Sequence, residues 1–197
     1  MKEDWGFSAL IETEDHTILF DAGADGETLM GNLDKLHIDP LKIDTIFISH
    51  HHFDHVGGLA TFLNANNDVK LFAPNSFRGV KNVRENIYIQ ESQELYPNIY
   101  TTGELDNIEQ SLIVKTDKSL VIIAGCSHPG LDKIIETAEQ YGKVYAIIGG
   151  FHDFRRIKSL EKVNILCPAH CTRFAEKIKK HYPEKYIQPG VGRTIEI

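Results

Sequence analysis

Short apolar runs alternate with amphipathic segments along most of this chain. The runs 43–49 and 144–150 are almost continuously apolar, which is typical of strands that are buried on both faces. The segments 25–38 and 130–141 instead place apolar residues every three or four positions, as on one face of a helix. The pattern therefore predicts strands and helices in alternation.

Polar turns join two pairs of short β-type runs, at 7–23 and at 111–125, and predict two hairpins. Thr172 is the expected N-cap of the last helix, because its hydroxyl can accept a backbone hydrogen bond there. Together these features predict an α/β (α+β) chain with two sheets sandwiched by helices. The remaining predicted elements are strands at 69–74, 86–92, 97–103, 163–170 and 193–197, helices at 57–66 and 172–182, and a short basic helix between the strands 144–150 and 163–170.

Composition narrows the class of protein. The chain has neither an internal repeat nor a linker, so its 197 residues are expected to form a single domain, 1–197. The formal net charge of −7 argues against a nucleic-acid or membrane partner, since both attract clustered basic residues. No signal peptide and no apolar run of roughly 20 residues is found. Three cysteines without a secretory signal indicate a reducing cytosol, and a cytoplasmic location is expected.

The stretch HHHFDH directly follows a predicted strand and gathers metal-binding side chains. Side chains alternate in an extended segment, so His50 and His52 point to one side and can chelate one ion, whereas His51 points away. Asp54 and His55 follow where the chain turns toward a helix, so they face another direction and suit a second ion. Imidazole and carboxylate are ligands of zinc, iron and manganese.

Three more histidines follow predicted strands: His128 in GCSHPG, His152 in GGFHDF and His170 in CPAHC. Seven of the ten histidines thus lie at four strand-to-loop junctions. A sheet that carries its loops at one end would gather these junctions in one cleft. The alternative interpretation is a histidine-rich surface loop, with the other histidines in ordinary core or surface positions. The common placement at strand ends favours a metal site.

With these motifs the chain resembles the metallo-β-lactamase superfamily, whose ordered motifs match FDAG, SHHHFDH, GCSH and CPAHC. It is more narrowly similar to the branch of dihydropteroate-synthase-like and methanopterin-pathway enzymes, which carry GCSH, GGFH and HCT stretches. The resemblance covers nearly the whole chain. It implies a four-layer αββα sandwich of two mixed sheets, with a metal cleft at one edge.

The resemblance also implies two divalent ions, with zinc as the expected metal and manganese or iron as alternatives. Asp21, in FDAG, matches an aspartate that supports the metal loops through hydrogen bonds, and its alternative role is to cap the following helix. The implied ligands are His50, His52 and His128 for the first ion, and Asp54, His55 and His170 for the second. A separate Cys/His zinc site from Cys126, Cys167 and Cys171 is a less favoured interpretation.

The chain departs from the family pattern in three places. GGFHDF stands where relatives carry a bridging aspartate, and we expect His152 rather than Asp153 to serve there, acting in catalysis together with Asp54. Arg173 stands where the branch has glycine; it either contacts an anionic group of the substrate or is simply solvated. A strand that relatives carry before Trp5 is missing, so the edge is expected to be covered by a second subunit in a homo-oligomer.

The chemistry follows from the ions, which lower the pKa of a bound water from about 16 toward 7. We therefore expect a metal-dependent hydrolase in which a metal-bound hydroxide, at a dinuclear site, attacks a small anionic ester, phosphoester or thioester. Two alternatives stay open. One is a non-catalytic, metal-dependent ligand-binding module. The other is a di-iron oxidoreductase, which is disfavoured because His52 occupies the position that is acidic in the corresponding HxExDH pattern.

Overall fold

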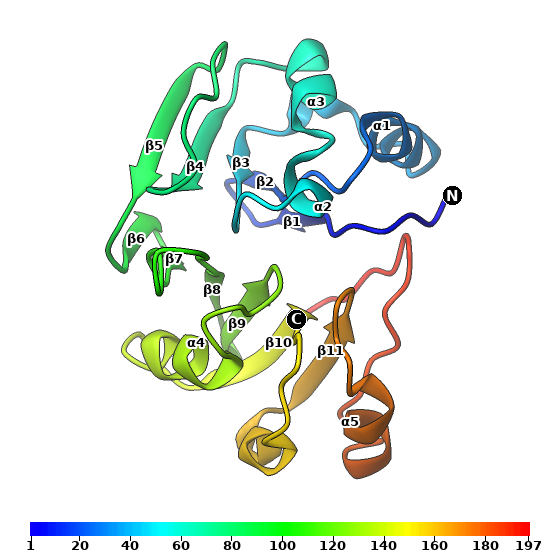
Figure 1. The fold of residues 1–197 in the computed structure, drawn as a ribbon, viewed down its shortest axis with the longest axis vertical. Helices are drawn as coiled ribbons and strands as arrows, with labels where there is room; N and C mark the ends of the chain where they lie inside the picture. The colour runs from blue at the N-terminus through cyan, green and yellow to red at the C-terminus, as the bar shows by residue number, and fades with distance from the viewer. The chain divides into compact units, whose positions relative to one another are not determined.

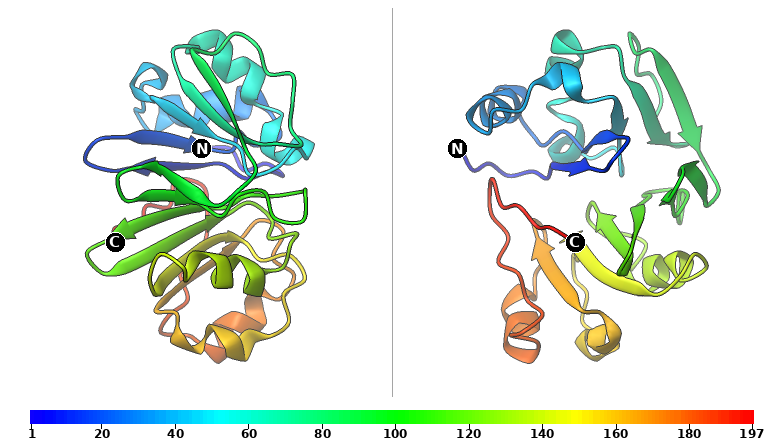
Figure 2. Two further views of the ribbon diagram at one scale, coloured as in Figure 1. Left: turned by 90° about the vertical axis from the view of Figure 1, so that its left-hand side faces the viewer. Right: turned by 180° about the vertical axis from the view of Figure 1, so that it is seen from behind.

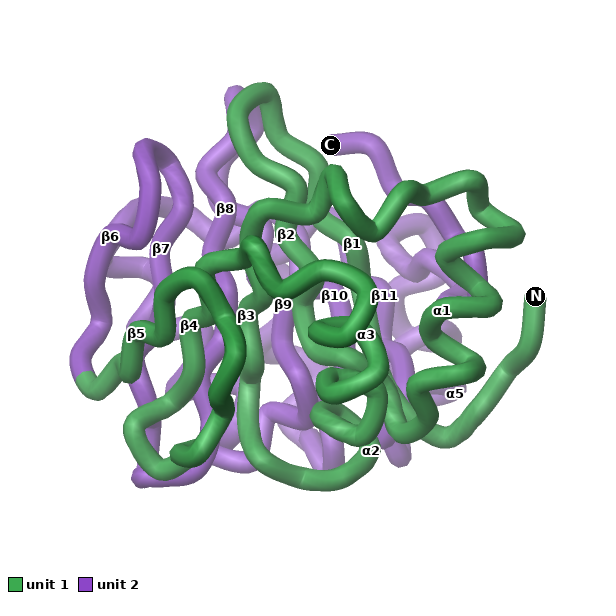
Figure 3. The backbone as a smooth tube through the Cα atoms, turned by 90° about the horizontal axis from the view of Figure 1, so that it is seen from above, with its two compact units in different colours: residues 1–90 green, residues 91–197 purple.

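The computed structural model describes residues 1–197, which form two compact units, 1–90 and 91–197. Figure 3 colours these units separately. Each unit contains one mixed β-sheet with helices packed against it. The predicted fold class is therefore confirmed, and the prediction of a single domain stays a prediction.

The sheet of the first unit has five strands in the order β1-β2-β3-β4-β5 (Figure 1). β1 and β2 pair antiparallel as the first predicted hairpin, and β2 to β5 pair parallel. Parallel neighbours end at the same edge of a sheet, so the loops that follow β2 and β3 lie next to each other. The strands are β1 Ala9–Glu12, β2 Thr17–Phe20, β3 Thr45–Phe47, β4 Lys70–Pro74 and β5 Glu85–Ile89.

Helices cover one face of this first sheet. They are α1 Gly26–Lys35, α2 Phe53–Val56 and α3 Leu59–Ala65, with a 3₁₀ turn η1 at Pro40–Lys42. The apolar stripes of α1 and α3 pack on side chains of β2, β3 and β4, as helical spacing predicts. The buried cluster comprises Leu19, Ala22, Leu29, Leu33, Ile43, Ile46, Ile48, Leu59, Phe62, Leu63, Val69, Leu71 and Ala73.

The sheet of the second unit has six strands in the order β11-β10-β9-β8-β7-β6. β6 to β9 pair antiparallel, which includes the second predicted hairpin, whereas β9, β10 and β11 run parallel. The loops after these three parallel strands therefore share one edge of the sheet. The strands are β6 Gln93–Tyr96, β7 Ile99–Thr101, β8 Leu112–Thr116, β9 Ser119–Ala124, β10 Val144–Gly150 and β11 Ile165–Ala169.

One face of the second sheet is covered by α4 Leu131–Ala138, the 3₁₀ helix η2 Ile157–Lys162 and α5 Ala175–His181 (Figure 2). Their apolar side chains form a core of their own with β8 to β11. This cluster comprises Ile113, Leu120, Ile122, Leu131, Ile134, Ala138, Val144, Ile147, Phe151, Leu160, Val163, Leu166 and Ile178.

Two details differ from the sequence predictions. Residues 193–197 form no strand. Thr172 does not cap α5, whose N-cap position is Phe174. Instead, the Thr172 hydroxyl donates to the carbonyl of Ala169 at 2.6 Å and accepts from the backbone N–H of Phe151 at 2.9 Å. A hydroxyl near a turn can satisfy local backbone groups as readily as a helix end, and sequence spacing does not distinguish these uses.

None of the helices is long and apolar enough to cross a lipid bilayer.

Candidate metal-binding site

The parallel register of β2 and β3 brings two predicted site segments together in the first unit. Phe20 pairs with Phe47, and the N–H of Asp21 donates to the Phe47 carbonyl at 2.8 Å. Asp21 therefore begins its loop beside Ser49, at the start of the histidine-rich segment. The backbone of Asp21 adopts the left-handed conformation, with φ 54°.

Asp21 is fully buried and accepts three hydrogen bonds from this segment. Its Oδ1 accepts from the Ser49 N–H at 2.7 Å, and its Oδ2 accepts from the Ser49 hydroxyl and from His55 Nδ1, each at 2.6 Å. Burial raises the pKa of Asp21, and the hydrogen bonds from His55 and Ser49 oppose that rise. The predicted supporting contacts are thus present. The alternative role as a helix cap is wrong, because Asp25 caps α1 by accepting from the Thr28 N–H at 2.8 Å.

These contacts orient two imidazole rings. When His55 Nδ1–H donates to the Asp21 carboxylate, Nε2 is the unprotonated ring nitrogen, on the side of the ring that faces Asp54. Ser49 donates its hydroxyl hydrogen to Asp21, so its oxygen accepts from Nδ1 of His50, 2.9 Å away. The Nε2 of His50 is then the ring nitrogen that faces His52, with 3.1 Å between His50 Nε2 and His52 Nδ1. Neutral imidazole with Nδ1 held by an oxygen is the form in which histidine binds metals through Nε2.

His50 and His52 lie at the separation expected for ligands of a single ion. The Nε2 of His50 and the Nδ1 of His52 are 3.1 Å apart. Two nitrogens on a tetrahedral zinc ion, each at 2.0–2.1 Å, lie about 3.3 Å from each other. His50 is fully buried, whereas His51 and His52 are both exposed. The chemistry and spacing of this donor pair therefore fit a divalent ion.

Asp54 and His55 come from the short helix α2, with Asp54 Oδ2 4.0 Å from His55 Nε2. The same Oδ2 accepts a hydrogen bond from the indole N–H of Trp5 at 3.1 Å. The backbone of the N-terminal segment also contacts this turn, since the Phe7 N–H donates to the Asp54 carbonyl at 3.0 Å. The contact of Trp5 was not predicted from the sequence, where only its position ahead of the first strand was noted.

In the second unit, strand register brings the other three motifs to one edge. Ala124 of β9 pairs with Gly149 of β10, and Gly150 pairs with Ala169 of β11. The segments GCSH, FHD and HCT therefore start at neighbouring positions. The hydroxyl of Ser127 ties two of them together by donating to the Gly150 carbonyl at 2.6 Å.

Left-handed backbone conformations recur at these strand ends. Ser127, His152 and His170 have φ values of 63°, 43° and 49°. Such conformations cost on the order of 1–3 kcal/mol each outside glycine and occur often at functional sites. Their position beside the predicted ligands is consistent with loops that are held in shape to present particular side chains.

The GCSH loop is built around Glu109, a residue that sequence reasoning missed. Glu109 is almost fully buried, and its carboxylate lies 2.8 Å from Nδ1 of His128. It lies 19 positions before His128, in an unremarkable polar stretch, so no local spacing pointed to it. It gives His128 the same kind of carboxylate partner that Asp21 gives His55.

Cys126 lies between two predicted ligands of the second unit. Its Sγ lies within 4.8 Å of a ring nitrogen of His128 and also of a ring nitrogen of His170. Cys171 is near by, with its Sγ 3.7 Å from the Cys126 carbonyl. Burial raises the pKa of Cys167 to about 11, and a thiol must lose its proton to bind a metal. The side-chain groups that lie close enough together to hold an ion include Cys126 but neither Cys167 nor Cys171, which disfavours the alternative zinc site that would use all three cysteines.

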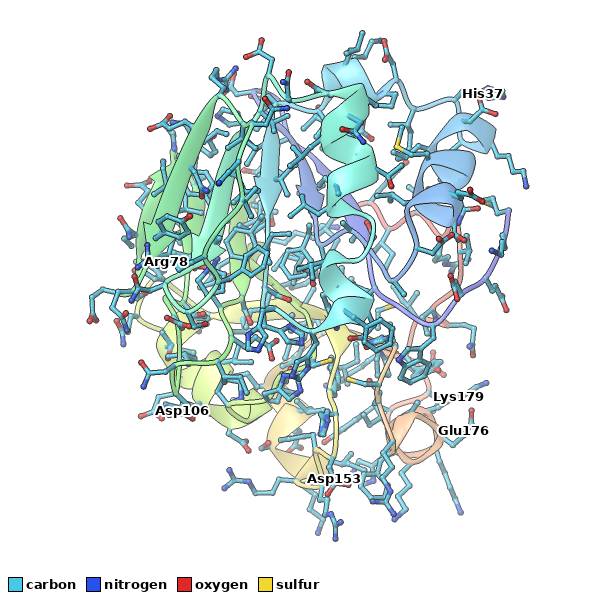
Figure 4. All side chains as sticks on the ribbon, turned by 45° about the horizontal axis from the view of Figure 1, so that its top comes forward. His37, Arg78, Asp106, Asp153, Glu176 and Lys179 are labelled. Atoms are coloured by element: carbon cyan, nitrogen blue, oxygen red, sulfur yellow. The ribbon has the colours of Figure 1, made fainter.

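His152 and Asp153 diverge after β10. The ring of His152 lies beside that of His128, with 5.1 Å between centroids. Asp153 is exposed at the outer edge of its unit (Figure 4) and accepts from Arg155 at 2.9 Å and from Arg173 at 3.5 Å. The geometry favours His152 for the site, and its predicted role stays a prediction. Arg173, the predicted substrate contact, is mostly exposed and paired with Asp153.

Comparison with known proteins identifies the family. The sequence pattern of the metallo-β-lactamase superfamily matches residues 5–136. This chain belongs to the metallo-β-lactamase superfamily. The prediction made from its motifs is confirmed, and membership implies divalent metal binding.

This chain is similar in sequence to several named proteins. It is 33% identical to the 7,8-dihydropterin-6-methyl-4-(β-D-ribofuranosyl)-aminobenzene-5′-phosphate synthase of Methanocaldococcus jannaschii, over 97% of this chain and 89% of that protein. It is 26% identical to a hydroxyacylglutathione hydrolase of Serratia proteamaculans, over 79% of this chain and 57% of that protein. The first similarity supports the predicted branch.

A solved structure shares the fold. Tm1679, described as a metal-dependent hydrolase of the β-lactamase superfamily, aligns with a TM-score of 0.81 and 24% identity, over 100% of this chain and 93% of that chain.

Proposed function

We propose that this protein binds two divalent metal ions and hydrolyses a small anionic ester, phosphoester or thioester. One observation carries the proposal: three histidines of the family motifs have Nδ1 beside an oxygen partner, which is the orientation in which histidine binds a metal through Nε2. These are His50 on Ser49, His55 on Asp21 and His128 on Glu109. Residues that served only in a solvated loop would not need buried carboxylate partners, because burying a charge is costly.

Family membership supports the assignment of ligands. By the resemblance of the motifs, His50, His52 and His128 would hold one ion, and Asp54, His55 and His170 the other. When bound, divalent ions activate a water molecule as nucleophile and stabilise negative charge that develops on the substrate. No serine or cysteine nucleophile is then required.

The protein's own residues would orient the reacting groups. Asp21 and Ser49 hold the histidine-rich segment, and Trp5 holds one oxygen of Asp54. His152, next to His128, can exchange a proton or hydrogen-bond an anionic substrate through its ring.

A basic cluster supports an anionic substrate. The cations of Arg155, Arg173 and Lys177 lie 5.5, 5.6 and 4.5 Å from the ring centroid of Phe174. A cavity of about 120 Å³ is lined in part by Arg155, Phe174 and Lys177. The cluster belongs to the loops and helix that follow His152 and His170, and Asp153 pairs with both of its arginines. Local positive charge in an acidic protein favours a small anion.

A synthase reaction is the second candidate, and the 33% identity to the M. jannaschii synthase favours it. That enzyme's name describes a product with a pterin ring and a ribose 5′-phosphate. The alignment spans 262 positions, more than this chain's 197 residues, so the relative contains internal segments that this chain lacks. Hydrolysis needs one organic substrate and water, whereas joining two organic substrates needs more binding surface. This difference supports the hydrolase.

The test is a substrate screen with the protein loaded with zinc, manganese or iron. Phosphoesters, thioesters, simple esters and lactones are offered singly, and a pterin with a ribosylated aminobenzene phosphate is offered as a pair. Metal-dependent hydrolysis that a chelator abolishes and added metal restores supports the proposal. Activity that survives exhaustive chelation contradicts it, and turnover of the paired substrates alone establishes the synthase instead.

The basic cluster is tested in the same assay. Lys177→Ala should raise KM for phosphate-bearing substrates and leave kcat nearly unchanged. Lys179→Ala is the matched control, because Lys179 lies on the same helix with its cation over Tyr186 instead of Phe174 (Figure 4). An equal effect of both substitutions would show that only net charge matters.

A further inference from the structure

Glu109 is a buried carboxylate with a full set of hydrogen-bond donors around it. Its Oε1 accepts from the backbone N–H groups of Cys126 and Ser127, both at 2.9 Å. Its Oε2 accepts from the backbone N–H of His128 at 2.8 Å. The same oxygen lies 2.8 Å from Nδ1 of the His128 ring. The carboxylate thus contacts three consecutive residues of the GCSH loop.

Three successive backbone N–H groups aimed at one anion form a nest, which stabilises negative charge without a positive side chain. A carboxylate buried this deeply is costly unless such donors replace water. In turn, the donors of the loop depend on Glu109, because a buried N–H without an acceptor is also costly. The shape of the loop and the position of this side chain therefore depend on each other.

The segment between β7 and β8 holds Glu109 in place. The Leu105 N–H donates to the Glu109 carbonyl at 2.9 Å. The residue after Glu109 is also held, because the Thr101 hydroxyl donates to the side-chain oxygen of Gln110 at 2.9 Å. At the tip of the segment, Asp106 pairs with Lys133 of α4 (Figure 4). This segment of buried polar residues positions a carboxylate beneath the loop after β9.

We propose that Glu109 is a positioning residue for the metal site: it keeps Nδ1 of His128 protonated, so that Nε2 is the atom presented to a metal. A carboxylate offers only lone pairs, so the ring nitrogen facing it carries the hydrogen. Histidine ligands are commonly oriented by a carboxylate in this way, and loss of the partner typically weakens metal binding. The inference rests on the proposed metal function, but the tautomer of His128 can be tested without metal or substrate.

Glu109→Gln is the informative substitution because it keeps the size of the side chain and turns one oxygen into an NH₂ group. At the Oε1 position, this NH₂ would face two backbone donors that cannot change. At the Oε2 position, it would face only one such backbone donor, the N–H of His128, together with Nδ1 of His128, which becomes an acceptor if the ring hydrogen moves to Nε2. The substitution therefore selects the tautomer that cannot bind a metal through Nε2.

The first measurement is nitrogen-15 NMR of the imidazole rings in the metal-free protein, at alkaline pH where histidine is neutral. Wild-type His128 should show hydrogen on Nδ1, and Glu109→Gln should move it to Nε2. Hydrogen on Nε2 in the wild type would overturn the proposal, and this result does not depend on whether any variant folds. Because neither metal nor substrate is present, a failure here is distinct from a failure of the proposed hydrolysis.

The second measurement is zinc affinity by competition with a chromophoric chelator. Glu109→Gln should weaken binding at the affected site by about 10- to 100-fold. Glu109→Asp retains the charge and should weaken it less. Thr101→Val is the matched control, since it removes two buried hydrogen bonds to the same segment, one to Gln110 and one from the Gly103 N–H, without touching His128; it should lower Tm and leave zinc affinity unchanged. Unchanged affinity in Glu109→Gln, or an equal loss in Thr101→Val, would overturn the proposal.

Discussion

Asp21→Asn tests how the first unit prepares its histidines for metal. In the wild type, Oδ2 of Asp21 accepts from both the Ser49 hydroxyl and His55 Nδ1. If an NH₂ group takes that position, His55 must offer a lone pair from Nδ1 and carry its hydrogen on Nε2. The Ser49 oxygen would accept from the NH₂ and turn its own hydrogen toward His50, whose ring would change tautomer as well.

One substitution should therefore disable two ligand atoms. Loss of one such partner typically costs about 10- to 100-fold in metal affinity. Because His50 and His55 are proposed ligands of different ions, each of the two sites should weaken by about 10- to 100-fold, which corresponds to about 1.4–2.8 kcal/mol per site at about 1.4 kcal/mol per tenfold change. The stability of the metal-free protein should change much less, because relief from burying the Asp21 charge offsets the lost hydrogen bonds.

The assay is zinc competition with a chelator, with urea unfolding of the metal-free protein as the check on folding. Asp25→Asn is the matched control, because the Asp25 side chain caps α1 by accepting from Thr28 and is exposed to none of the changes at Ser49, His50 or His55. It should alter stability and leave zinc affinity unchanged. A folded Asp21→Asn protein whose zinc affinity falls by less than about tenfold would refute the reasoning, since even one lost partner predicts more.

Four further results are expected. His52→Ala should lose bound metal and activity together, because its Nδ1 lies 3.1 Å from His50 Nε2, whereas His51→Ala should be nearly silent because side-chain alternation directs it away from that pair; equal losses would contradict the geometry. Zinc should change the fluorescence of Trp5, the single tryptophan, because its indole N–H donates a hydrogen bond to Asp54, a proposed zinc ligand. An unchanged spectrum at full zinc occupancy would show that Asp54 is not a ligand. The Cys167 thiol, with a pKa raised to about 11, should resist iodoacetamide at neutral pH until the protein unfolds, as followed by mass spectrometry. Finally, urea unfolding should show metal-free stability falling as pH rises from the ordinary Asp value of 3.8 through the raised pKa of Asp21, because the folded state binds that proton more tightly than the unfolded chain; Asp21→Asn should lack this component.

The sequence alone determined the order of elements and the family. Continuous apolar runs and helical spacing marked β3, β9, β10 and α4, since burial imposes its period on neighbouring residues. The HxHxDH stretch and the motifs at later strand ends identified the superfamily, because ligand spacing within one loop is a local property. Residues 193–197 misled the same reasoning, since a short run of β-formers does not reveal whether a neighbouring strand is there to pair with it.

Only the tertiary structure decided which buried groups orient the histidines. Asp21 reaches Ser49 and His55 across 28 and 34 positions, and Glu109 reaches His128 across 19. The register of β2 and β3 creates the first of these pairs, and the segment between β7 and β8 creates the second. Neither can be predicted from the spacing of residues within one motif. The division between His152 and Asp153 also required coordinates, because a left-handed turn after β10 breaks the simple alternation of side chains. Periodic burial can be read along a chain, whereas satisfying a buried carboxylate depends on which distant donors the fold brings to it.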